Sequence, residues 1–523
     1  MRKLKDIRKI KEIDKIEEVN KIEETNKTEK NDIKVEKEKI NNYKSVKVYI
    51  GLFLFVLGIA LLITCVWVDE TFGPVSTESI IFQLKTPMTG AGGYVIDYLK
   101  NVVLLSIAIG LLFFITIGKK LKKNVILISG ACSFVAFFVF FSIYLGFFEY
   151  VYHQMQTTEI YDEYYVNPEE VDIIFPEEKR NLIYVYMESM ENTYKSEEEG
   201  GYFEYNLIPN LTKLQRENVS FGIDGKGASI ASNCDWTIAA MTAMSAGIPL
   251  SIPMGENEYG RWDDFLPGLC NLGDILEREG YTNEICIGSD SSFAGTNHLY
   301  EQHGNYKIMD YEKQIDCGYV RDGYFVWWGV EDKKLYGIAK KEILDLASKN
   351  EPFNFVMATM DTHTEDGYKC SRCGDEYEEQ YANVIKCADM QVYDFVKWVQ
   401  EQDFYDNTTI IIVGDHLSMD PDFFEEIDDS DYERTIYGVI INPYFDDDSD
   451  IIKNLNKERV FNTMDMFPTT LAALGVKIEG DRLGLGTNLF SDKQTLSEML
   501  GTEYINNEIL LRSKYYEQKF LKK

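Results

Sequence analysis

The sequence predicts an α/β domain, built on a mostly parallel sheet with helices on both faces and preceded by N-terminal transmembrane helices. Three largely apolar stretches in the first 150 residues are about as long as a helix that spans a bilayer. Behind them, short apolar runs such as 409–413, TIIIV, alternate with amphipathic segments. Runs of this kind are typical of strands that are buried on both faces of a parallel sheet.

The charge balance excludes one broad class of function. The chain has 523 residues, and its formal net charge of −33 comes from 53 basic and 86 acidic residues. A nucleic-acid-binding protein needs a basic face, so we expect no nucleic-acid partner. An anionic substrate would have to be held by a metal, by helix N-termini or by a few local cations.

The first 45 residues form a segment of their own. They consist almost entirely of Lys, Glu, Ile, Asn and Asp, and the hexapeptide KIEEVN at Lys15 is followed by KIEETN at Lys21. A period of six fits neither a heptad nor a straight helix, so no coiled coil is expected. We predict a charged cytoplasmic tail, 1–45, that is disordered or partly helical.

The predicted membrane domain, 46–150, has three spans. Lys44 and Lys47 lie at the start of the first, and Lys119–Lys123 lies between the second and third. The positive-inside rule places both groups in the cytoplasm, so loop 69–100 and everything after the third span lie outside the cytoplasmic membrane. A cleavable signal peptide is not expected behind so long a charged tail. The second stretch can also be a buried core helix. The spans are 46–68, 101–118 and 125–148.

Seven cysteines follow the membrane domain. An extracytoplasmic location permits disulfides, and an odd number leaves at least one thiol unpaired. Cys370 and Cys373 have the spacing of half a zinc site. Without a second such pair in the sequence, a disulfide or free thiols is favoured, and the pairing stays open. The seven are Cys234, Cys270, Cys286, Cys317, Cys370, Cys373 and Cys387.

An acidic linker, 151–180, is expected to lead into the catalytic domain, 181–523. Alternation of strands and helices there predicts the parallel sheet. The expected strands are 181–187, 281–287, 352–360, 409–413 and 436–441. The expected helices are 211–217, 269–280, 334–349, 377–402 and 462–474.

Polar residues follow three of these strands. Glu188 follows the first, His363 the third, and Asp415 with His416 the fourth. Because the carboxyl ends of parallel strands share one edge of a sheet, we expect these four side chains to converge. Carboxylates and imidazoles are ligands for a divalent metal.

A nucleophile is available in the segment around Thr237. The Ala- and Met-rich run that follows favours a helix, which places Thr237 at or near a helix N-terminus, where free N–H groups favour an anion. Thr237 can instead be an N-cap, and Asp235 can cap equally well. Cys234 is a rival nucleophile, but no histidine is paired with it.

Several motifs resemble the sulfatase-like, alkaline-phosphatase-like superfamily. Within it the chain is similar to membrane-anchored phosphoglycerol transferases of the glucan-decorating type and, more distantly, to lipoteichoic acid synthase. The motifs that carry the resemblance are LIYVYMESMENTY (182–194), LIPNLTKL (207–214), DWTIAAMTAMSAGIPL (235–250), FLPGLCNLGDILEREGY (265–281), SFAG (292–295), MDTHTEDGY (360–368), VGDHLSM (413–419) and LGLGTNLF (483–490).

The resemblance implies specific roles for these residues. Glu188, Thr237, Asp415 and His416 would bind one divalent metal, Mn²⁺ or Mg²⁺, and Thr237 would also be the nucleophile. His363 would bind the phosphoglycerol head group or protonate the leaving group. The pocket would be lined by 290–298, including Asp290, Phe293 and His298. Ala294 and Thr296 stand where lipoteichoic acid synthase has tryptophan and arginine.

The implied reaction transfers phosphoglycerol from phosphatidylglycerol through a Thr237 ester and releases diacylglycerol. The acceptor would be a glucan, a glycolipid or a glycerol-phosphate chain. Phosphoethanolamine transfer and hydrolysis of sulfate or phosphodiesters on the same fold are alternatives, as is a non-catalytic membrane-tethered binding protein. Sulfatases convert a Cys or Ser in a C/S-x-P-x-R motif to formylglycine, and the sequence from Cys234 does not match that motif.

Overall fold

The computed structural model describes residues 2–72, 75–85, 92–222, 224–252, 264–428, 431–445 and 458–522. The chain divides into two compact units, Met1–Trp67 with Ile96–Tyr144, and Val68–Val95 with Leu145–Lys523. Parts of the predicted outer loop, 73–74 and 86–91, lie outside the described residues.

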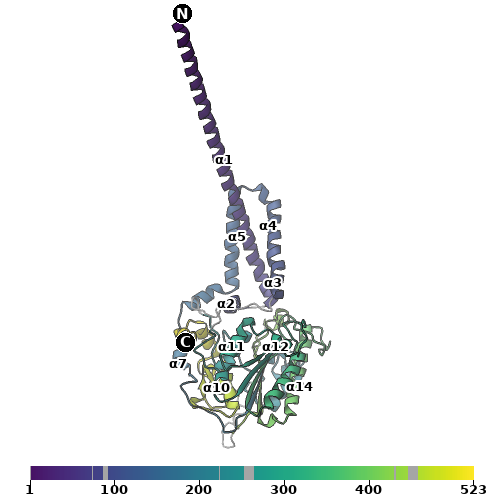
Figure 1. The fold of residues 1–523 in the computed structure, drawn as a ribbon. Coiled ribbons are helices and arrows are strands. Elements are labelled where there is room, and N and C mark those ends of the chain that lie inside the picture. Colours follow the sequence, from purple (N-terminus) through teal and green to yellow (C-terminus); the bar gives the residue numbers. More distant parts are fainter. Residues whose placement is uncertain are drawn as a thin grey trace. The chain divides into compact units, whose positions relative to one another are not determined.

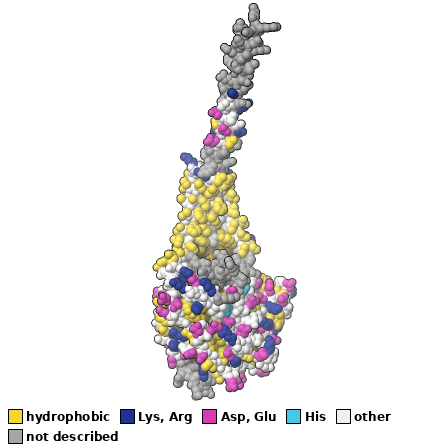
Figure 2. All heavy atoms as spheres, turned by 60° about the vertical axis from the view of Figure 1, so that its left-hand side comes forward, with side chains coloured by type: hydrophobic (Ala, Val, Ile, Leu, Met, Phe, Trp, Pro, Cys, Tyr) yellow, Lys and Arg dark blue, Asp and Glu magenta, His cyan; other side chains and the backbone are white. Residues whose placement is uncertain are grey.

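The first unit contains helices α1 (Arg2–Phe72), α4 (Leu105–Thr116) and α5 (Lys123–Tyr144). Three helical stretches, Val46–Phe72, Tyr94–Lys120 and Lys123–Tyr144, are long and apolar enough to cross a membrane. Hydrophobic side chains cover these helices in Figure 2. Three apolar helices thus occur where the sequence predicts three membrane spans, each long enough to cross a bilayer.

The second of these stretches has exposed apolar side chains. Leu104, Leu112 and Ile115 are 61%, 62% and 58% exposed. Apolar side chains this exposed along one helix need an apolar surrounding such as lipid. The prediction of a transmembrane span is thus favoured over the alternative of a buried helix.

The bounds differ from the prediction in this part of the chain. The first two apolar stretches are Val46–Phe72 and Tyr94–Lys120, where 46–68 and 101–118 were predicted. Helix α1 continues without a break from Arg2 to Phe72, so the tail predicted as disordered or partly helical lies within it. Helix α5 ends at Tyr144 instead of 148, because Gly146 at φ 68° turns the chain before α6 (Phe147–Gln154).

The second unit is organised around a six-stranded sheet with the order β4-β3-β5-β2-β6-β7. All neighbours are parallel except β6 and β7, which are antiparallel. Its strands are β2 (Asn181–Met187), β3 (Thr282–Ile287), β4 (Lys307–Met309), β5 (Phe353–Ala358), β6 (Thr408–Gly414) and β7 (Gly438–Ile441). Two small antiparallel pairs join β1 (Ile173–Ile174) to β8 (Lys477–Ile478) and β9 (Arg482–Leu483) to β10 (Gly486–Thr487). The predicted mostly parallel sheet is confirmed.

Helices cover both faces of this sheet (Figure 1). One hydrophobic core includes Tyr184 and Tyr186 with α9, α10, α11 and α16, and the other includes Ile183 and Val185 with α8, α13 and α14. Alternate residues of β2 thus enter opposite cores, as the two-residue period of a strand requires. The bounds are α8 (Pro209–Glu217), α9 (Thr237–Ala246), α10 (Leu272–Arg278), α11 (Thr296–Gln302), α13 (Asp332–Ala347), α14 (Gln380–Gln400) and α16 (Met466–Ala473).

Shorter helices complete the two units. They are α2 (Thr77–Lys85), α3 (Gly92–Tyr98), α7 (Ile160–Tyr164), α12 (Tyr311–Asp316), α15 (Pro421–Asp428), α17 (Leu496–Leu500), α18 (Thr502–Leu510) and α19 (Lys514–Lys519).

The segment predicted as an acidic linker is part of the folded unit. Ile160 and Tyr161 are buried, and the Tyr161 ring packs edge-on against Tyr516 and Phe520. Strand β1 adds a pairing to β8. The acidic composition of this segment concealed its aromatic residues, whose burial stabilises the unit. The folded part therefore begins well before residue 181.

Candidate active site

Four predicted site residues converge from three elements. Glu188 follows β2, Asp415 and His416 follow β6, and Thr237 is the first residue of α9. Strands β2 and β6 are parallel neighbours, and Met187 pairs with Gly414 at their ends. The residues that follow therefore leave the sheet side by side at its carboxyl edge. Glu188, Asp415 and His416 are buried and Thr237 is half-buried.

The Nε2 atom of His416 is the centre of this donor cluster. It lies 3.3 Å from Thr237 Oγ1, 3.4 Å from Asp415 Oδ2 and 3.6 Å from Glu188 Oε1. Ligands placed tetrahedrally about 2.1 Å from a cation are about 3.4 Å apart. The nitrogen and two carboxylate oxygens also lie within 4.8 Å of one another. One imidazole, two carboxylates and a hydroxyl thus have the type and spacing of ligands to a single divalent cation.

Hydrogen bonds orient the imidazole and both carboxylates of this cluster. The Nδ1–H of His416 donates to the carbonyl oxygen of Leu417 at 2.9 Å, which leaves Nε2 for a ligand. Asp415 Oδ1 accepts from the backbone N–H groups of Ser189 and His416, both at 2.8 Å, and its other oxygen faces the cluster. The Ser189 hydroxyl donates to Glu188 Oε1 at 2.8 Å. The donor atoms are therefore held in place by the protein itself.

The electrostatics of the cluster favour a bound cation. Burial, reinforced by the charge of Glu188, raises the pKa of Asp415 to about 7. For His416, burial disfavours the charged imidazole, but Asp415 and Glu188 outweigh it and raise its pKa to about 9. The Asp415 shift reflects burial of a carboxylate beside a second one, and the His416 shift reflects attraction of both carboxylates for positive charge, which either a proton on His416 or a metal ion supplies.

Thr237 does not cap its helix. The N-cap of α9 is Trp236, with no side-chain hydrogen bond to the helix, so both sequence alternatives, a cap by Thr237 and a cap by Asp235, are wrong. Thr237 instead directs its hydroxyl at His416. The rival nucleophile Cys234 is fully buried, and burial raises the pKa of its thiol, which disfavours the reactive thiolate.

His363 lies in the loop that follows β5. Its neighbour Thr362 donates a 2.5 Å hydrogen bond to the carbonyl oxygen of Glu188, which ties this loop to the donor cluster. The Nδ1–H of His363 donates to Thr364 O at 2.7 Å. Its ring centre lies 5.1 Å from that of Trp328, and Trp328 in turn lies 5.2 Å from Phe293.

Trp328 is the residue that sequence reasoning missed. It is half-buried, and it joins His363 to Phe293, two residues that were expected to share a pocket. The only signal was the adjacent aromatic pair Trp327-Trp328 in a segment with no strand or helix pattern.

Two of the predicted pocket residues, Asp290 and His298, have polar contacts with residues close to them in sequence. Asp290 Oδ1 accepts hydrogen bonds from the backbone N–H and the hydroxyl of Ser292, at 2.9 and 2.7 Å. The Nδ1 atom of His298 lies 3.3 Å from Gln302 Nε2. Neither contact connects its residue with the donor cluster.

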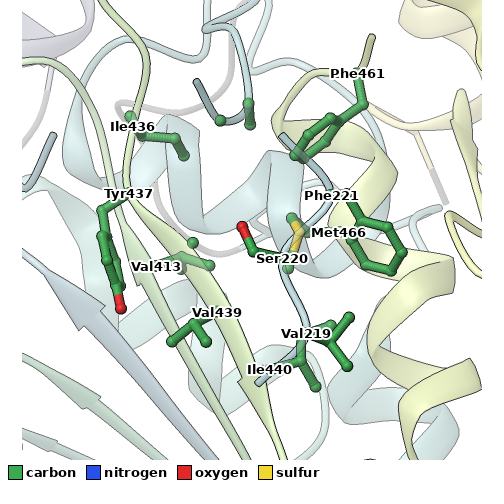
Figure 3. Close-up of a pocket in the computed structure, with 13 residues that line it drawn as sticks. Val219, Ser220, Phe221, Val413, Ile436, Tyr437, Val439, Ile440, Phe461 and Met466 are labelled. Atoms are coloured by element: carbon green, nitrogen blue, oxygen red, sulfur yellow. The ribbon is translucent and has the colours of Figure 1, made fainter. Parts of the chain in front are cut away.

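An apolar pocket lies beside β6 and β7 but belongs to the core (Figure 3). Val413 stands on one side of it and Phe221 and Phe461 on the other. It contains none of the four donors, although Val413 precedes Asp415 by only two residues. Its lining has no carboxylate, histidine, lysine or cysteine, and the hydroxyl of Tyr437 donates to the carbonyl oxygen of Leu211, so we assign no catalytic role to this pocket.

Together, the six-stranded sheet, its helix layers and the polar strand ends define an alkaline-phosphatase-like α/β fold. The family model described as Sulfatase matches residues 180–476, more than half of the chain. The protein belongs to the sulfatase family.

The chain is also similar in sequence to curated proteins named phosphoglycerol transferase I. The chain is 29% identical over 394 residues to phosphoglycerol transferase I of Xanthomonas campestris, covering 70% of this chain and 52% of the relative. It is 28% identical over 347 residues to phosphoglycerol transferase I of Salmonella choleraesuis, covering 64% of this chain and 42% of the relative. The chain thus spans about half the length of the curated relatives it matches.

A solved structure supports the fold. The lipoteichoic acid synthase of Listeria monocytogenes superposes with a TM-score of 0.50 and 16% identity, covering 68% of this chain and 96% of that one.

Proposed function

We propose that this protein transfers phosphoglycerol from phosphatidylglycerol to an extracytoplasmic acceptor, with Thr237 as the nucleophile. The observation that carries the proposal is the 3.3 Å approach of the Thr237 hydroxyl to His416 Nε2, beside two buried carboxylates. A threonine hydroxyl with no role as a cap, on the first turn of a helix, is placed for attack on an anionic centre.

Glu188, Asp415, His416 and Thr237 would hold one divalent cation, Mn²⁺ or Mg²⁺. A cation bound there supplies positive charge that acidifies the threonine hydroxyl and neutralises the phosphodiester. The carboxylates and the imidazole are held by Ser189 and by the carbonyl of Leu417, so the donors need little rearrangement when they bind it.

The chemistry of the first step follows from these groups. Thr237 reacts as its alkoxide, after its hydroxyl proton has passed to water: a bond forms between its Oγ1 and phosphorus while the bond from phosphorus to the diacylglycerol oxygen breaks. His363, as an imidazolium whose Nδ1–H is held by Thr364 O, donates its Nε2 proton to the departing oxygen. In the second step a hydroxyl of the acceptor gives its proton to the now neutral His363, attacks phosphorus and displaces the Thr237 alkoxide, which restores both groups.

Phe293 and Trp328 would position His363 for that proton transfer. The ring of Trp328 contacts both residues and would form one wall of the head-group pocket, and we propose Asp290 and His298 as further polar residues of the same pocket. The three membrane helices would keep the domain at the bilayer that contains the donor lipid, with the catalytic unit on the outer side. The acceptor would be a polysaccharide, a glycolipid or a glycerol-phosphate chain.

The test compares donor lipids with the full chain in lipid–detergent micelles. With Mn²⁺ and labelled phosphatidylglycerol, we expect release of diacylglycerol and a phosphoglycerol adduct on the peptide that contains Thr237, detected by mass spectrometry. Phosphatidylethanolamine should give neither product. Preference for phosphatidylethanolamine would establish the alternative transferase, and an unchanged rate in the Thr237→Ala variant would exclude the proposed nucleophile.

A further inference from the structure

Three cysteines outside the active site converge in the second unit. Cys370 and Cys373 belong to the loop between β5 and α14, and Cys387 comes from α14 itself. The Sγ atom of Cys370 lies 3.7 Å from that of Cys373 and 3.8 Å from that of Cys387, and all three sulfurs lie within 4.8 Å of one another. All three are free thiols.

These separations match a tetrahedral thiolate site. With zinc–sulfur bonds of about 2.3 Å, two thiolates of a tetrahedral site are about 3.8 Å apart. A disulfide instead needs a sulfur–sulfur distance of about 2.05 Å and would use only two of the three residues. The cluster therefore has the geometry in which one cation contacts all three sulfurs.

Neighbouring groups already donate to the sulfurs. The backbone N–H of Arg372 lies 3.4 Å from Cys370 Sγ, and Gln391 Nε2 lies 3.5 Å from Cys387 Sγ. Donors of this kind stabilise thiolates and orient them toward a metal. The turn from Cys370 to Cys373 is closed by a 3.1 Å backbone hydrogen bond, so both sulfurs of the loop lie on one side of it.

We propose that Cys370, Cys373 and Cys387 bind a thiophilic divalent cation, with Zn²⁺ as the best match, at a second metal site distinct from the donor cluster at Glu188. Soft thiolate ligands select zinc over manganese or magnesium, so the two sites would hold different metals. Cys370 and Cys387 are buried and Cys373 is half-buried, which leaves the fourth position open on the side of Cys373 for a water ligand.

Such a cation would fasten the loop that carries His363. This loop is attached to α14 at Tyr381, whose hydroxyl donates to Thr362 O at 2.9 Å. A cation bound by Cys370, Cys373 and Cys387 would attach the loop to the same helix a second time, farther along the loop. The site would thus be structural, and its existence does not depend on which lipid the enzyme uses.

Cobalt substitution tests the proposal directly. The full chain would be purified in detergent with a phosphine reductant, stripped by a chelator and titrated with Co²⁺, in the Glu188→Gln background that weakens the other site. We expect a thiolate-to-cobalt charge-transfer band and tetrahedral visible bands. Cys387→Ser should abolish the charge-transfer band, and zinc affinity should fall by more than the roughly 10–100-fold that losing an outer-shell partner costs.

The matched control is Cys317→Ser, which changes an exposed cysteine outside the cluster and should leave the band unchanged. If Cys387→Ser does not fold by circular dichroism, Cys373→Ser at the half-buried position replaces it. Absence of the band in the parent protein would overturn the proposal, as would its persistence in both variants. A disulfide among the three, found after alkylation in native membranes, would also overturn it.

Discussion

The hydroxyl of Thr237 lies 3.3 Å from the Nε2 atom of His416, across the gap between the first turn of α9 and the end of β6. Replacing Thr237 by alanine removes the proposed nucleophile, so we expect diacylglycerol release to fall at least about 1,000-fold, on the scale of losing a catalytic group. Thr237→Ser keeps the hydroxyl and should retain measurable activity. Lipid analysis by chromatography measures both.

The matched control for Thr237 is Thr242→Ser, on the same helix. Thr242 is fully buried and donates only to the carbonyl of Ile238 within the described contacts, so its change tests packing of α9 without touching the donor cluster. Both Thr237 variants should melt within a few degrees of the parent. An active alanine variant would contradict the role of Thr237.

Much of this cluster could be predicted from sequence because strand ends in a parallel sheet share one edge. The run 181–187 matches β2, and 409–413 lies within β6, so Glu188, Asp415 and His416 could be placed at that edge. Contacts between distant loops carry no such periodic signal. Trp328 and Cys387 were therefore missed as partners of His363 and Cys370.

The predicted start of the folded domain was wrong because the composition of a segment does not show whether its side chains are buried. The acidic stretch around Tyr161 was predicted as a linker, but its tyrosines pack against Tyr516 and Phe520 near the other end of the chain. That burial depends on partners about 350 residues away, and a local reading of charge does not reveal them.

Removing the metal should destabilise the parent far more than it destabilises Glu188→Gln. In the parent, free Mn²⁺ at about 100 times its Kd adds about 2.7 kcal/mol to stability, which a chelator removes. Without metal, Glu188→Gln should melt close to the parent, because Glu188 repels the buried carboxylate of Asp415 but attracts the His416 imidazolium. When Mn²⁺ is added, the melting temperature of the variant should rise far less than that of the parent.

Calorimetric Mn²⁺ titration and thermal melts with and without chelator measure these effects. Glu433→Gln is the control, because its carboxylate is 65% exposed and pairs with Lys226. A parent protein that neither binds nor is stabilised by Mn²⁺, Mg²⁺ or Zn²⁺ would favour the non-catalytic alternative.

Trp328 should act on catalysis through His363. Trp328→Ala removes the ring that contacts both His363 and Phe293, and a displaced proton donor lowers kcat by roughly 10–100-fold. Trp328→Phe should recover part of this loss because it restores an aromatic contact. Since the metal donors are untouched, Mn²⁺ affinity should stay at the parent value, which separates positioning from a general loss of structure.

The adjacent Trp327 provides the control. Its side chain is 37% exposed, and its ring contacts Tyr368 at 6.4 Å. Trp327→Ala should change kcat by less than about 3-fold, within the usual range of surface substitutions. Equal losses in the two alanine variants would refute the specific role of Trp328.

Glu191 should be the most costly carboxylate to truncate near the site. It is fully buried, accepts from Arg434 at 2.6 and 3.1 Å, and accepts from the N–H of Ser418 at 2.7 Å. Glu191→Ala leaves the Arg434 charge largely buried without its carboxylate, so we expect a loss of about 3–5 kcal/mol. Denaturant unfolding measures it. Breaking the exposed Lys226–Glu433 pair should cost less than about 1 kcal/mol.

The carboxyl of Asp389 on α14 should make stability fall as pH rises. It accepts hydrogen bonds from Leu211 N–H and the Asn210 side chain, both at 2.7 Å, at the N-terminal end of α8. Burial outweighs these donors and raises its pKa from 3.8 to about 6. Between these values the unfolded chain loses the proton and the folded chain keeps it, so raising the pH across this window favours unfolding.

The pH effect of Asp389 is measured as a difference between variants, because other groups titrate in the same range. Across this window, a shift of about two pKa units lowers the stability of the parent by about 3 kcal/mol relative to Asp389→Asn, which cannot ionise. The melting temperature of the parent minus that of the variant should therefore decrease from pH 4 to about 6 and then level off. Asp345→Asn, at an exposed pair with Lys349, should show a flat difference. A rising difference for Asp389→Asn would show that the hydrogen bonds from α8 outweigh burial.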